Sequence, residues 1–224
     1  MFLGQRCVAC ERPGALVCAS CADQLQPAHP FDAPADLDSC VALLAYGGVA
    51  RELIVALKYR NARTLVRRCG AALAALVRAD GPPGAGAGFE VVTWAPTGRA
   101  RRRARGYDQA ELVARAAARA LRVPAQALLV RGEGVAQTGL SREARLMGPV
   151  FTLAPGAQNR RGAAILVVDD VLTTGATLAA AARALRELDP VHLGGAVLAH
   201  TELIALPAPA EAGRRTEPSR PPPA

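Results

Sequence analysis

The stretch Ile165-Leu-Val-Val-Asp-Asp-Val-Leu-Thr-Thr-Gly-Ala-Thr-Leu178 decides the fold of this chain. An apolar, mostly β-branched run ends in two adjacent carboxylates, Asp169 and Asp170, and a hydroxyl-rich turn then leads into an Ala-rich segment. This order predicts a strand, a loop and the start of a helix. A strand without polar residues until its end is buried on both faces, as in a parallel sheet, and ligands of such sheets lie at the carboxyl ends of the strands. The functional site is therefore expected at residues 169–177.

The turn after the acid pair predicts a phosphate site. The first backbone N–H groups of the following helix lack internal partners and point toward the turn. A glycine lets the main chain approach a ligand closely, and threonine hydroxyls add donors without adding charge. The residues expected to hold the phosphate are Thr173, Thr174, Gly175, Ala176 and Thr177.

The two carboxylates predict a sugar next to that phosphate. Asp169 and Asp170 only accept hydrogen bonds, so they suit the vicinal hydroxyls of a ribose, directly or through bound Mg2+. A phosphate at one end and a diol at the other describe a ribose 5-phosphate. The other interpretation is an ordinary capping turn after a strand. The unbroken segment resembles the phosphoribosyl diphosphate (PRPP) binding motif of type I phosphoribosyltransferases, and this resemblance favours the sugar phosphate.

Strand and helix patterns alternate along most of the chain, which predicts an α/β fold with a doubly wound, mainly parallel sheet. Strands are expected at residues 41–46, 89–94, 126–130, 150–153, 163–168 and 191–199, and helices at 49–59, 64–77, 108–121 and 176–188. The expected organisation is a zinc knuckle at 1–26, a linker at 27–39, a phosphoribosyltransferase-like domain at 40–206 and a disordered, proline-rich tail at 207–224.

Two Cys-x-x-Cys pairs near the amino terminus predict a structural zinc site. Cys7, Cys10, Cys18 and Cys21 supply four thiolates, the ligand set of a closed tetrahedral zinc site. The segment has few apolar residues, so the metal is expected to order it. A redox site is the alternative, but a redox motif needs one Cys-x-x-Cys beside a helix rather than two pairs.

The chain has a formal net charge of +8, and Lys58 is its only lysine. Five arginines lie between Arg99 and Arg105, with Gly98 and Gly106 on either side. We expect an open loop that closes over a pyrophosphate and excludes water. A solvated face and a contact with a nucleic-acid backbone are the alternatives for these arginines. No apolar stretch is long enough for a signal peptide or a membrane span, so we expect a cytoplasmic protein without membrane insertion.

Several motifs, taken in their order, resemble those of the ComF family of competence-associated phosphoribosyltransferase-like proteins. They are the four-cysteine segment, Ala56-Leu-Lys-Tyr-Arg60, Arg105-Gly-Tyr-Asp-Gln-Ala110, Gln137-Thr-Gly-Leu-Ser-Arg-Glu-Ala-Arg145 and the acid pair with its turn. The resemblance runs from about Cys7 to His200. Asp108 and Met147 depart from the family pattern, in which the first position usually holds Asn and the second often does.

The resemblance implies a role for each part of the predicted site. Asp169 and Asp170 would hold the ribose hydroxyls, and the turn at 173–177 would hold the 5-phosphate. Lys58 and Tyr59 would approach the pyrophosphate, and Mg2+ would accompany PRPP. If transfer occurs, catalysis would fall to the acid pair, Lys58 and Arg103, which stabilise charge on the departing pyrophosphate.

The resemblance also implies a role in DNA uptake during natural transformation. Single-stranded DNA would bind at the zinc knuckle and the basic loop, and a DNA-uptake helicase or recombination proteins would be partners. The alternative is a nucleobase-salvage phosphoribosyltransferase, which needs buried groups matched to its base. Residues 135–151 would cover the base, and they offer Gln137, Thr138 and Ser141 but no aromatic residue before Phe151, which favours the first hypothesis.

Overall fold

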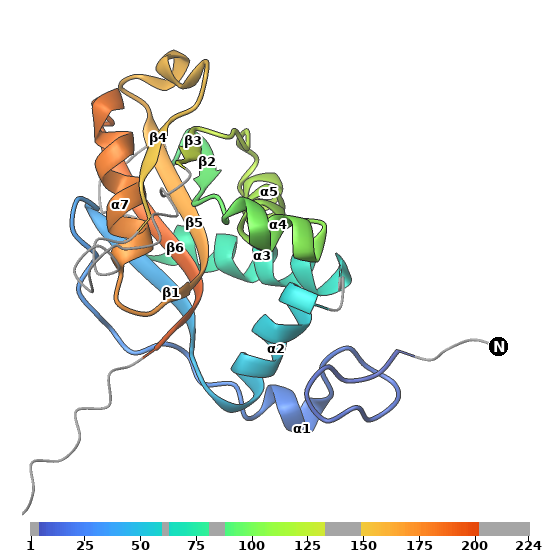
Figure 1. The fold of residues 1–224 in the computed structure, drawn as a ribbon. Coiled ribbons are helices and arrows are strands. Elements are labelled where there is room, and N and C mark those ends of the chain that lie inside the picture. Colours follow the sequence, from blue (N-terminus) through green and yellow to red (C-terminus); the bar gives the residue numbers. More distant parts are fainter. Residues whose placement is uncertain (1–4, 60–62, 81–87, 133–148, 202–224) are drawn as a thin grey trace, which may run out of the picture.

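A computed structural model describes residues 5–59, 63–80, 88–132 and 149–201 (Figure 1). Its centre is a four-stranded sheet in which every neighbouring pair of strands is parallel. In spatial order the strands are β1 (Ser39–Ala45), β6 (His192–His200), β5 (Ala164–Leu172) and β2 (Val91–Trp94). The expected parallel sheet is confirmed, and β5, which contains the acid pair, lies between two other strands.

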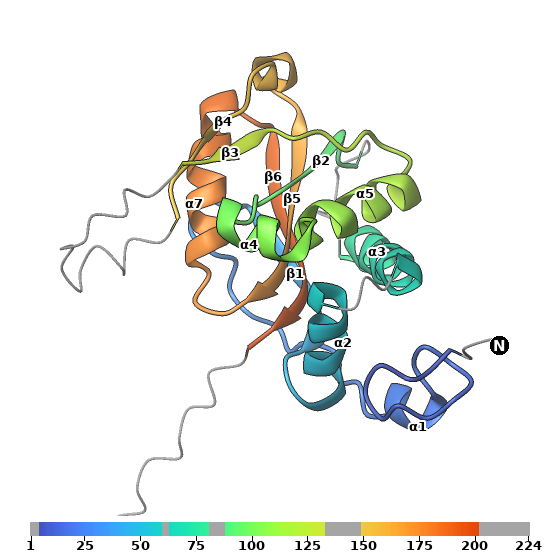
Figure 2. The same cartoon turned by 45° about the vertical axis from the view of Figure 1, so that its right-hand side comes forward.

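Helices cover both faces of the sheet, as Figures 1 and 2 show. Along β5, Leu166 and Val168 belong to one hydrophobic cluster, whereas Ile165 and Val167 belong to another, because successive strand residues alternate between faces. The first cluster includes α2, α3 and α5, and the second includes α7. The predicted doubly wound arrangement is therefore confirmed. The helices are α2 (Gly48–Tyr59), α3 (Arg63–Ala79), α5 (Gln109–Leu121) and α7 (Ala176–Leu185), and α7 continues into the 3-10 turn η2 (Arg186–Leu188).

Two of these helices approach each other closely at a glycine. A Cβ atom at Gly70 of α3 would lie 2.4 Å from the Cβ of Ala116 in α5, which is too close for any side chain. The small residues at this point therefore let the backbones of the two helices meet, and α3 and α5 pack together in one hydrophobic cluster.

A second, two-stranded antiparallel sheet lies beside α7. It consists of β3 (Leu129–Arg131) and β4 (Phe151–Leu153), followed by the 3-10 turn η1 (Ala157–Arg160). Leu128, Leu129 and Phe151 are buried in the same hydrophobic cluster as α7. This packing holds the last residue of β3, Arg131, near the end of β2, where its Nη1 donates to the carbonyl oxygen of Pro96.

The amino-terminal segment, with the short helix α1 (Ala19–Ala22), lies against α2 and away from the sheet in both views. Cys7, Val8 and Cys21 are buried in the hydrophobic cluster that also contains α2. Phe31 and Leu37, from the expected linker, pack against the α7 cluster. The division at residues 26–27 stays a prediction, and the tail at 207–224 lies outside the described residues.

The element that contains the acid pair is longer than predicted. The sequence analysis ends the strand at Val168, but β5 continues to Leu172 because Asp169 pairs with Val197 and Leu172 pairs with His200 of β6. Local sequence marks the first polar residue as the end of the strand. Pairing with a long neighbouring strand extends it past that residue.

The arginine-rich segment also differs from its prediction, since the expected open loop is the helix α4 (Arg99–Arg105). Arginine has a high helix propensity, and all side chains of α4 are at least partly exposed, so their like charges are screened by water. Gly106 ends the helix in the left-handed conformation, with φ of 79°.

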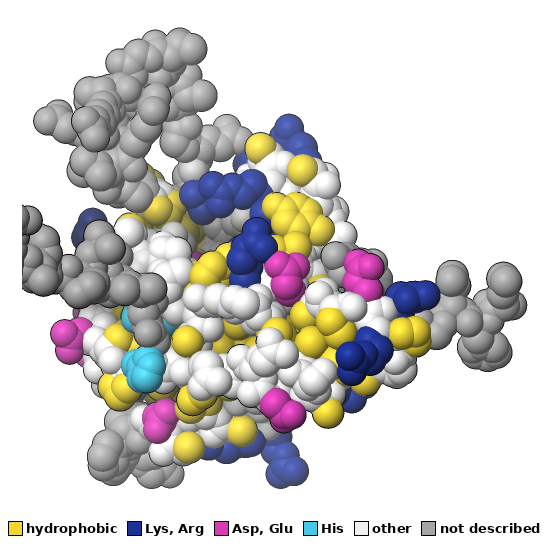
Figure 3. All heavy atoms as spheres, turned by 90° about the horizontal axis from the view of Figure 1, so that it is seen from below, with side chains coloured by type: hydrophobic (Ala, Val, Ile, Leu, Met, Phe, Trp, Pro, Cys, Tyr) yellow, Lys and Arg dark blue, Asp and Glu magenta, His cyan; other side chains and the backbone are white. Residues whose placement is uncertain are grey.

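The surface mixes charges of both signs. On the face seen in Figure 3, basic side chains lie scattered among hydrophobic and acidic ones rather than in a single patch. Among the helices that the structure describes, none is both long and apolar enough to cross a membrane.

Candidate functional site

Asp169 and Asp170 are adjacent in sequence but lie on opposite faces of β5. Because strand residues alternate, Asp169 follows Val167 toward α7, and Asp170 follows Val168 toward α2. Both residues line one cavity of about 230 Å3 at the carboxyl end of the sheet. The acid pair can therefore meet a ligand from two sides.

Lys58 is the partner of Asp170. The Nζ atom of Lys58 lies 2.9 Å from Oδ2 of Asp170, and the two side chains are 23% and 19% exposed. Lys58 is in the last turn of α2, whose buried residues Leu53, Ile54 and Leu57 anchor the helix in the hydrophobic cluster. The structure thus brings together two residues that the sequence analysis assigned to one site from distant segments.

The environment of the Asp169 carboxyl disfavours its ionised form. Its Oδ1 accepts a hydrogen bond of 2.8 Å from the N–H of Asp170. Burial, followed by the neighbouring charge of Asp170, raises the pKa of Asp169 to about 8. This carboxyl is therefore poised to exchange a proton near neutral pH, and ligand hydroxyls or a cation would favour its ionised form.

The turn predicted to hold a phosphate adjoins the acid pair. Thr173 and Thr177 line the cavity, and Gly175 and Ala176 line a small depression next to it. Gly175 precedes α7 with φ of 78° and places no side chain over the first turn. Thr174 differs from Thr173 and Thr177 in that its side chain faces the start of the helix: its hydroxyl oxygen accepts a weak 3.5 Å hydrogen bond from the N–H of Ala176.

The amino terminus of α7 retains free donors. Within the described part of the chain, the N–H groups of Thr177 and Leu178 donate to no acceptor, and the first helical bond runs from Ala179 to the oxygen of Gly175. Free N–H groups at the positive end of a ten-residue helix favour an anion. The turn is thus open in the way that a phosphate site requires.

The cavity is also lined by residues that the sequence analysis did not assign to a site. Asp108 is 3% exposed and caps α5, since its Oδ1 accepts from the N–H of Ala110 and its Oδ2 accepts from the N–H of Thr97. Burial raises the pKa of Asp108, and these N–H groups oppose the shift. Asp108 therefore ties the end of β2 to the start of α5 and adds a third carboxyl to the cavity.

Gln109, the next residue, is also 3% exposed and lines the cavity. Its buried Nε2 has no hydrogen-bond partner among the residues that the structure describes. An unpartnered buried amide is costly unless a ligand or water satisfies it. Gln109 belongs to the motif at 105–110 that supported the family resemblance, and this was the only sequence signal for it.

Arg131 contributes a cation to the same cavity. Its guanidinium lies 5.7 Å from the ring centroid of Phe151, and Nη1 donates to the Pro96 oxygen at 3.3 Å. Burial, and then the nearby charge of Arg101, lowers the pKa of this guanidinium. A single arginine at the end of a short strand leaves no recognisable pattern in the sequence.

Only one face of α4 reaches the cavity. Arg101 and Arg105, four residues apart, line it, whereas Arg103, the residue assigned to catalysis, is exposed and absent from the lining. Residues four apart share a helix face, and a residue midway between them points elsewhere. The role of Arg103 stays a prediction that this geometry does not favour.

A larger cleft of about 700 Å3 adjoins the cavity, and Lys58 and Arg105 line both. Tyr59 is 67% exposed at its edge, and Arg105 lies over the Tyr59 ring at 5.0 Å and donates to its hydroxyl at 3.2 Å. Further lining residues are Arg67, Tyr107, Arg115 and Arg119. Tyr59 therefore lies in the cleft beside the cavity rather than in the cavity itself.

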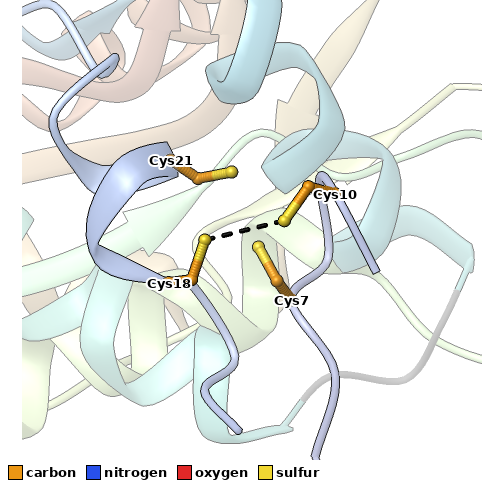
Figure 4. Close-up of side chains that lie close together, drawn as sticks. All are labelled: Cys7, Cys10, Cys18 and Cys21. Atoms are coloured by element: carbon orange, nitrogen blue, oxygen red, sulfur yellow. Dashed lines mark hydrogen bonds between the residues drawn. The ribbon is translucent and has the colours of Figure 1, made fainter. Parts of the chain in front are cut away.

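The four cysteines predicted to bind zinc converge on one point (Figure 4). Their sulfur atoms all lie within 4.8 Å of one another, and those of Cys10 and Cys18 are 3.6 Å apart. A tetrahedral zinc site with Zn–S bonds of about 2.3 Å needs sulfur atoms about 3.8 Å apart, so the set fits this metal.

The thiols of this cluster differ in acidity. Backbone N–H groups, that of Cys10 first, lower the pKa of Cys7 to about 6, while hydrogen bonding with Cys18 raises the pKa of Cys21 to about 12. One thiolate is thus already favoured before a cation arrives. All six cysteines are free, so none of the four is committed to a disulfide.

Comparison with known families places the acid pair in a recognised domain. Residues 108–216, just under half of the chain, match the model of the phosphoribosyl transferase domain. This part of the chain is phosphoribosyltransferase-like. The matched range contains α5, Arg131, the acid pair and the turn before α7, whereas Lys58 and the cysteines precede it. No curated protein matches the sequence.

Three solved structures illustrate what the fold is similar to. The glutamine PRPP amidotransferase from B. subtilis is 18% identical, with a TM-score of 0.43, and the alignment covers 64% of this chain but only 30% of the amidotransferase. An allosteric regulatory enzyme of purine biosynthesis is 17% identical, with a TM-score of 0.41, and is likewise covered over 30% of its length. The purine phosphoribosyltransferase from Pyrococcus horikoshii is 19% identical, with a TM-score of 0.37 and coverage of 63% and 78%. Because these three TM-scores are below 0.5, the fold assignment depends on the strand order and the family match rather than on these structures.

The segment expected to cover a nucleobase, residues 135–151, lies mostly outside the described residues. Phe151 is described and is buried under Arg131. The roles of Gln137, Thr138 and Ser141 therefore stay predictions.

Proposed function

We propose that this protein binds PRPP with Mg2+ and acts as a phosphoribosyltransferase-like protein. The observation that supports this most is the shared cavity: two carboxylates from β5, the open amino terminus of α7 and the only lysine of the chain meet there. A phosphate, a diol and a pyrophosphate each need one of these three groups.

The proposed orientation of PRPP follows from the position of each group. The 5-phosphate lies at Thr173 and Thr177, where the free N–H groups at the start of α7 can donate to an anion. Asp169 and Asp170 accept hydrogen bonds from the ribose hydroxyls. The pyrophosphate lies toward Lys58 and Arg105, which face both the cavity and the larger cleft.

The proposed reaction needs no covalent nucleophile. As the anomeric bond breaks, negative charge grows on pyrophosphate, and Lys58 and Arg105 stabilise it in a partly enclosed site. Mg2+ would be held by the phosphates and the acid pair and would supply further positive charge to the leaving group. Whether the protein turns PRPP over or only binds it depends on an acceptor.

A thermal-shift titration tests PRPP binding. PRPP with Mg2+ should raise the melting temperature of the wild type, because a ligand that binds only the folded state stabilises it. Asp170→Asn should lose this shift, whereas Asp80→Asn, an exposed acid at the end of α3, should retain it. An unchanged shift in Asp170→Asn would contradict the role of the acid pair.

A second proposed function is binding of single-stranded DNA, in line with the resemblance to the ComF family and its role in DNA uptake. The larger cleft supports it, because arginines and two tyrosines line it together, and backbone charge and base stacking need these two residue types. A DNA-uptake helicase or recombination proteins would then be partners. The free cysteines favour a reducing compartment and therefore the cytoplasm.

Fluorescence anisotropy with labelled oligo(dT) tests this second function. Affinity should fall steeply with salt, and Arg67→Gln with Arg119→Gln should lower both affinity and its salt dependence. Arg68→Gln is the matched control, since Arg68 is exposed on α3 but does not line the cleft. Binding that is indifferent to ionic strength would exclude phosphate contacts.

Nucleobase salvage remains the alternative function for the PRPP site. It predicts pyrophosphate release when Mg2+, PRPP and one particular neutral base are mixed with the protein. Base-dependent release would place salvage ahead of DNA uptake.

A further inference from the structure

The cavity has two basic ends, and only one of them is needed for the pyrophosphate of PRPP. We propose that the other end, formed by Arg131, recognises an anionic acceptor that bears a carboxylate. This inference rests on the proposed function, because it names the class of acceptor that would meet PRPP in the same cavity.

Helix α4 separates the two ends. The residue that precedes the helix, Gly98, adjoins Arg131, since a Cβ atom at Gly98 would lie 3.8 Å from Nε of Arg131. The last arginine of the helix, Arg105, contacts Tyr59, the neighbour of Lys58. A helix of seven residues is about 10 Å long at 1.5 Å per residue, and Arg131 and Lys58 lie near its opposite ends.

The acid pair divides in the same way. Asp170 is paired with Lys58 at 2.9 Å, whereas Asp169 lies on the opposite face of β5, toward α7 and the sheet that contains Arg131. Ribose hydroxyls held between the two carboxylates would thus have Lys58 on one side and Arg131 on the other. The leaving group and the acceptor of a transfer reaction can occupy these two sides.

Displacement at carbon needs such an arrangement. The lone pair of the acceptor nucleophile forms the new bond to the anomeric carbon while the carbon–oxygen bond breaks. The electron pair of the broken bond leaves with pyrophosphate, and any proton on the nucleophile passes to solvent. The nucleophile approaches opposite the leaving group, so with pyrophosphate at Lys58 the acceptor lies at Arg131.

The guanidinium of Arg131 has a free edge for a carboxylate. Nη1 donates to Pro96, and the Phe151 ring lies against the guanidinium at 5.7 Å. The Nε and Nη2 donors, which form one edge of the group, have no partner within the described residues, and Gly98 places no side chain beside them. Two parallel N–H donors on one edge match the two oxygens of a carboxylate.

Charge also favours an anion at this end. Arg131 forms no ion pair within 4.0 Å of any described carboxylate, and Arg101 is the next cation along the cavity. Asp169 and Asp108 act on the charge of Arg131 from the same cavity, but burial raises the pKa of Asp169 to about 8, so that Asp108 is the main anion facing these two guanidinium groups at neutral pH. A neutral base would leave positive charge at this end, whereas an acceptor with a carboxylate would compensate it.

Matched pairs of small probes test this inference by calorimetry. The probes are pyridine-3-carboxylate against pyridine-3-carboxamide and benzoate against benzamide, which differ within each pair in charge rather than shape. With Mg2+ and saturating PRPP, the wild type should bind the carboxylates about tenfold or more tightly than the carboxamides. Arg131→Gln should abolish this preference, Arg131→Lys should retain part of it, and Arg68→Gln, an exposed control on α3, should retain all of it.

Three results would overturn the inference. They are equal affinity for both members of each pair, no binding of any probe, and a loss of PRPP affinity in Arg131→Gln, which would assign Arg131 to the pyrophosphate. A titration of the wild type with Mg2+ and PRPP alone distinguishes failure of PRPP binding from failure of the carboxylate site. If PRPP does not bind, the proposed function fails, while an Arg131-dependent preference for carboxylates without PRPP would still support the anion site.

Discussion

The cysteine cluster and the acid-pair cavity differ in whether their polar groups share a common partner. In the cluster, four thiols converge within 4.8 Å, so that one metal ion would satisfy all of them and is expected to order the segment around it. In the cavity, a carboxyl with a raised pKa, an unpartnered amide and an unpaired guanidinium lie together without a common partner. In a structural site the polar groups bind one another or a metal ion, and this stabilises the fold. In a ligand site they stay without partners until the ligand binds, and this lowers the stability of the free protein.

Removal of the metal ligands should have the largest effect. Cys18→Ser with Cys21→Ser should unfold residues 5–26, because structural zinc contributes about 10–16 kcal/mol in comparable peptides. Hydrogen exchange should show lost protection there and retained protection in β5 and β6. Cys69→Ser, on α3 and outside the cluster, is the control. Retained protection of residues 5–26 would mean that hydrophobic packing alone orders this segment.

Loss of the cavity lysine should have the next largest effect. Lys58→Met removes the charge that faces both Asp170 and the proposed pyrophosphate, so PRPP affinity should fall about 10- to 100-fold, as expected for a hydrogen bond to a charged group. Isothermal titration with Mg2+ and PRPP measures this. Lys58→Arg keeps the charge and should recover part of the affinity. Equal affinity in Lys58→Met and the wild type would remove Lys58 from the site.

Neutralisation of Asp169 should make the protein more stable at high pH. The folded-state pKa is raised to about 8 from an ordinary value of about 4, so the folded state binds more protons between these values. The contribution of Asp169 to the stability of the wild type should therefore fall as pH rises from about 4 to 8. Asp169→Asn cannot ionise, and its melting temperature at pH 9 should exceed that of the wild type by about 3 °C or more.

The two proteins should converge toward pH 4, where the wild-type carboxyl is protonated in the folded state. Asp80→Asn, an exposed acid, controls for the loss of one negative charge. A difference that is the same at every pH would show that ionisation of Asp169 is not its cause.

Replacement of Gln109 should have the smallest effect on stability and should also raise it. Gln109→Met removes the buried amide that lacks a partner, so the free energy of unfolding should increase by about 1 kcal/mol, while PRPP binding weakens. Urea denaturation measures the first change and calorimetry the second. Gln126→Met is the matched opposite, because Gln126 accepts a 2.8 Å hydrogen bond from Arg160 and its loss should destabilise the protein.

The sequence by itself determined most of the helices and strands of this protein and named many of the residues that meet in the candidate sites. A continuous apolar run, and strand patterns that alternate with helix patterns, predicted a mainly parallel sheet, and the four-stranded sheet confirms it, since such patterns depend only on which residues can be buried. The four cysteines and the acid pair were visible for a similar reason, because each set lies in a short segment with a distinctive spacing.

Only the tertiary structure decided which groups face one another. Pairing with β6 carries β5 past its first polar residue and so turns Asp169 and Asp170 to opposite faces. The helical geometry of α4 places Arg101 and Arg105, but not Arg103, at the cavity. The packing of β3 against α7 places Arg131 there. These outcomes depend on contacts between residues far apart in the chain, which a local pattern does not contain.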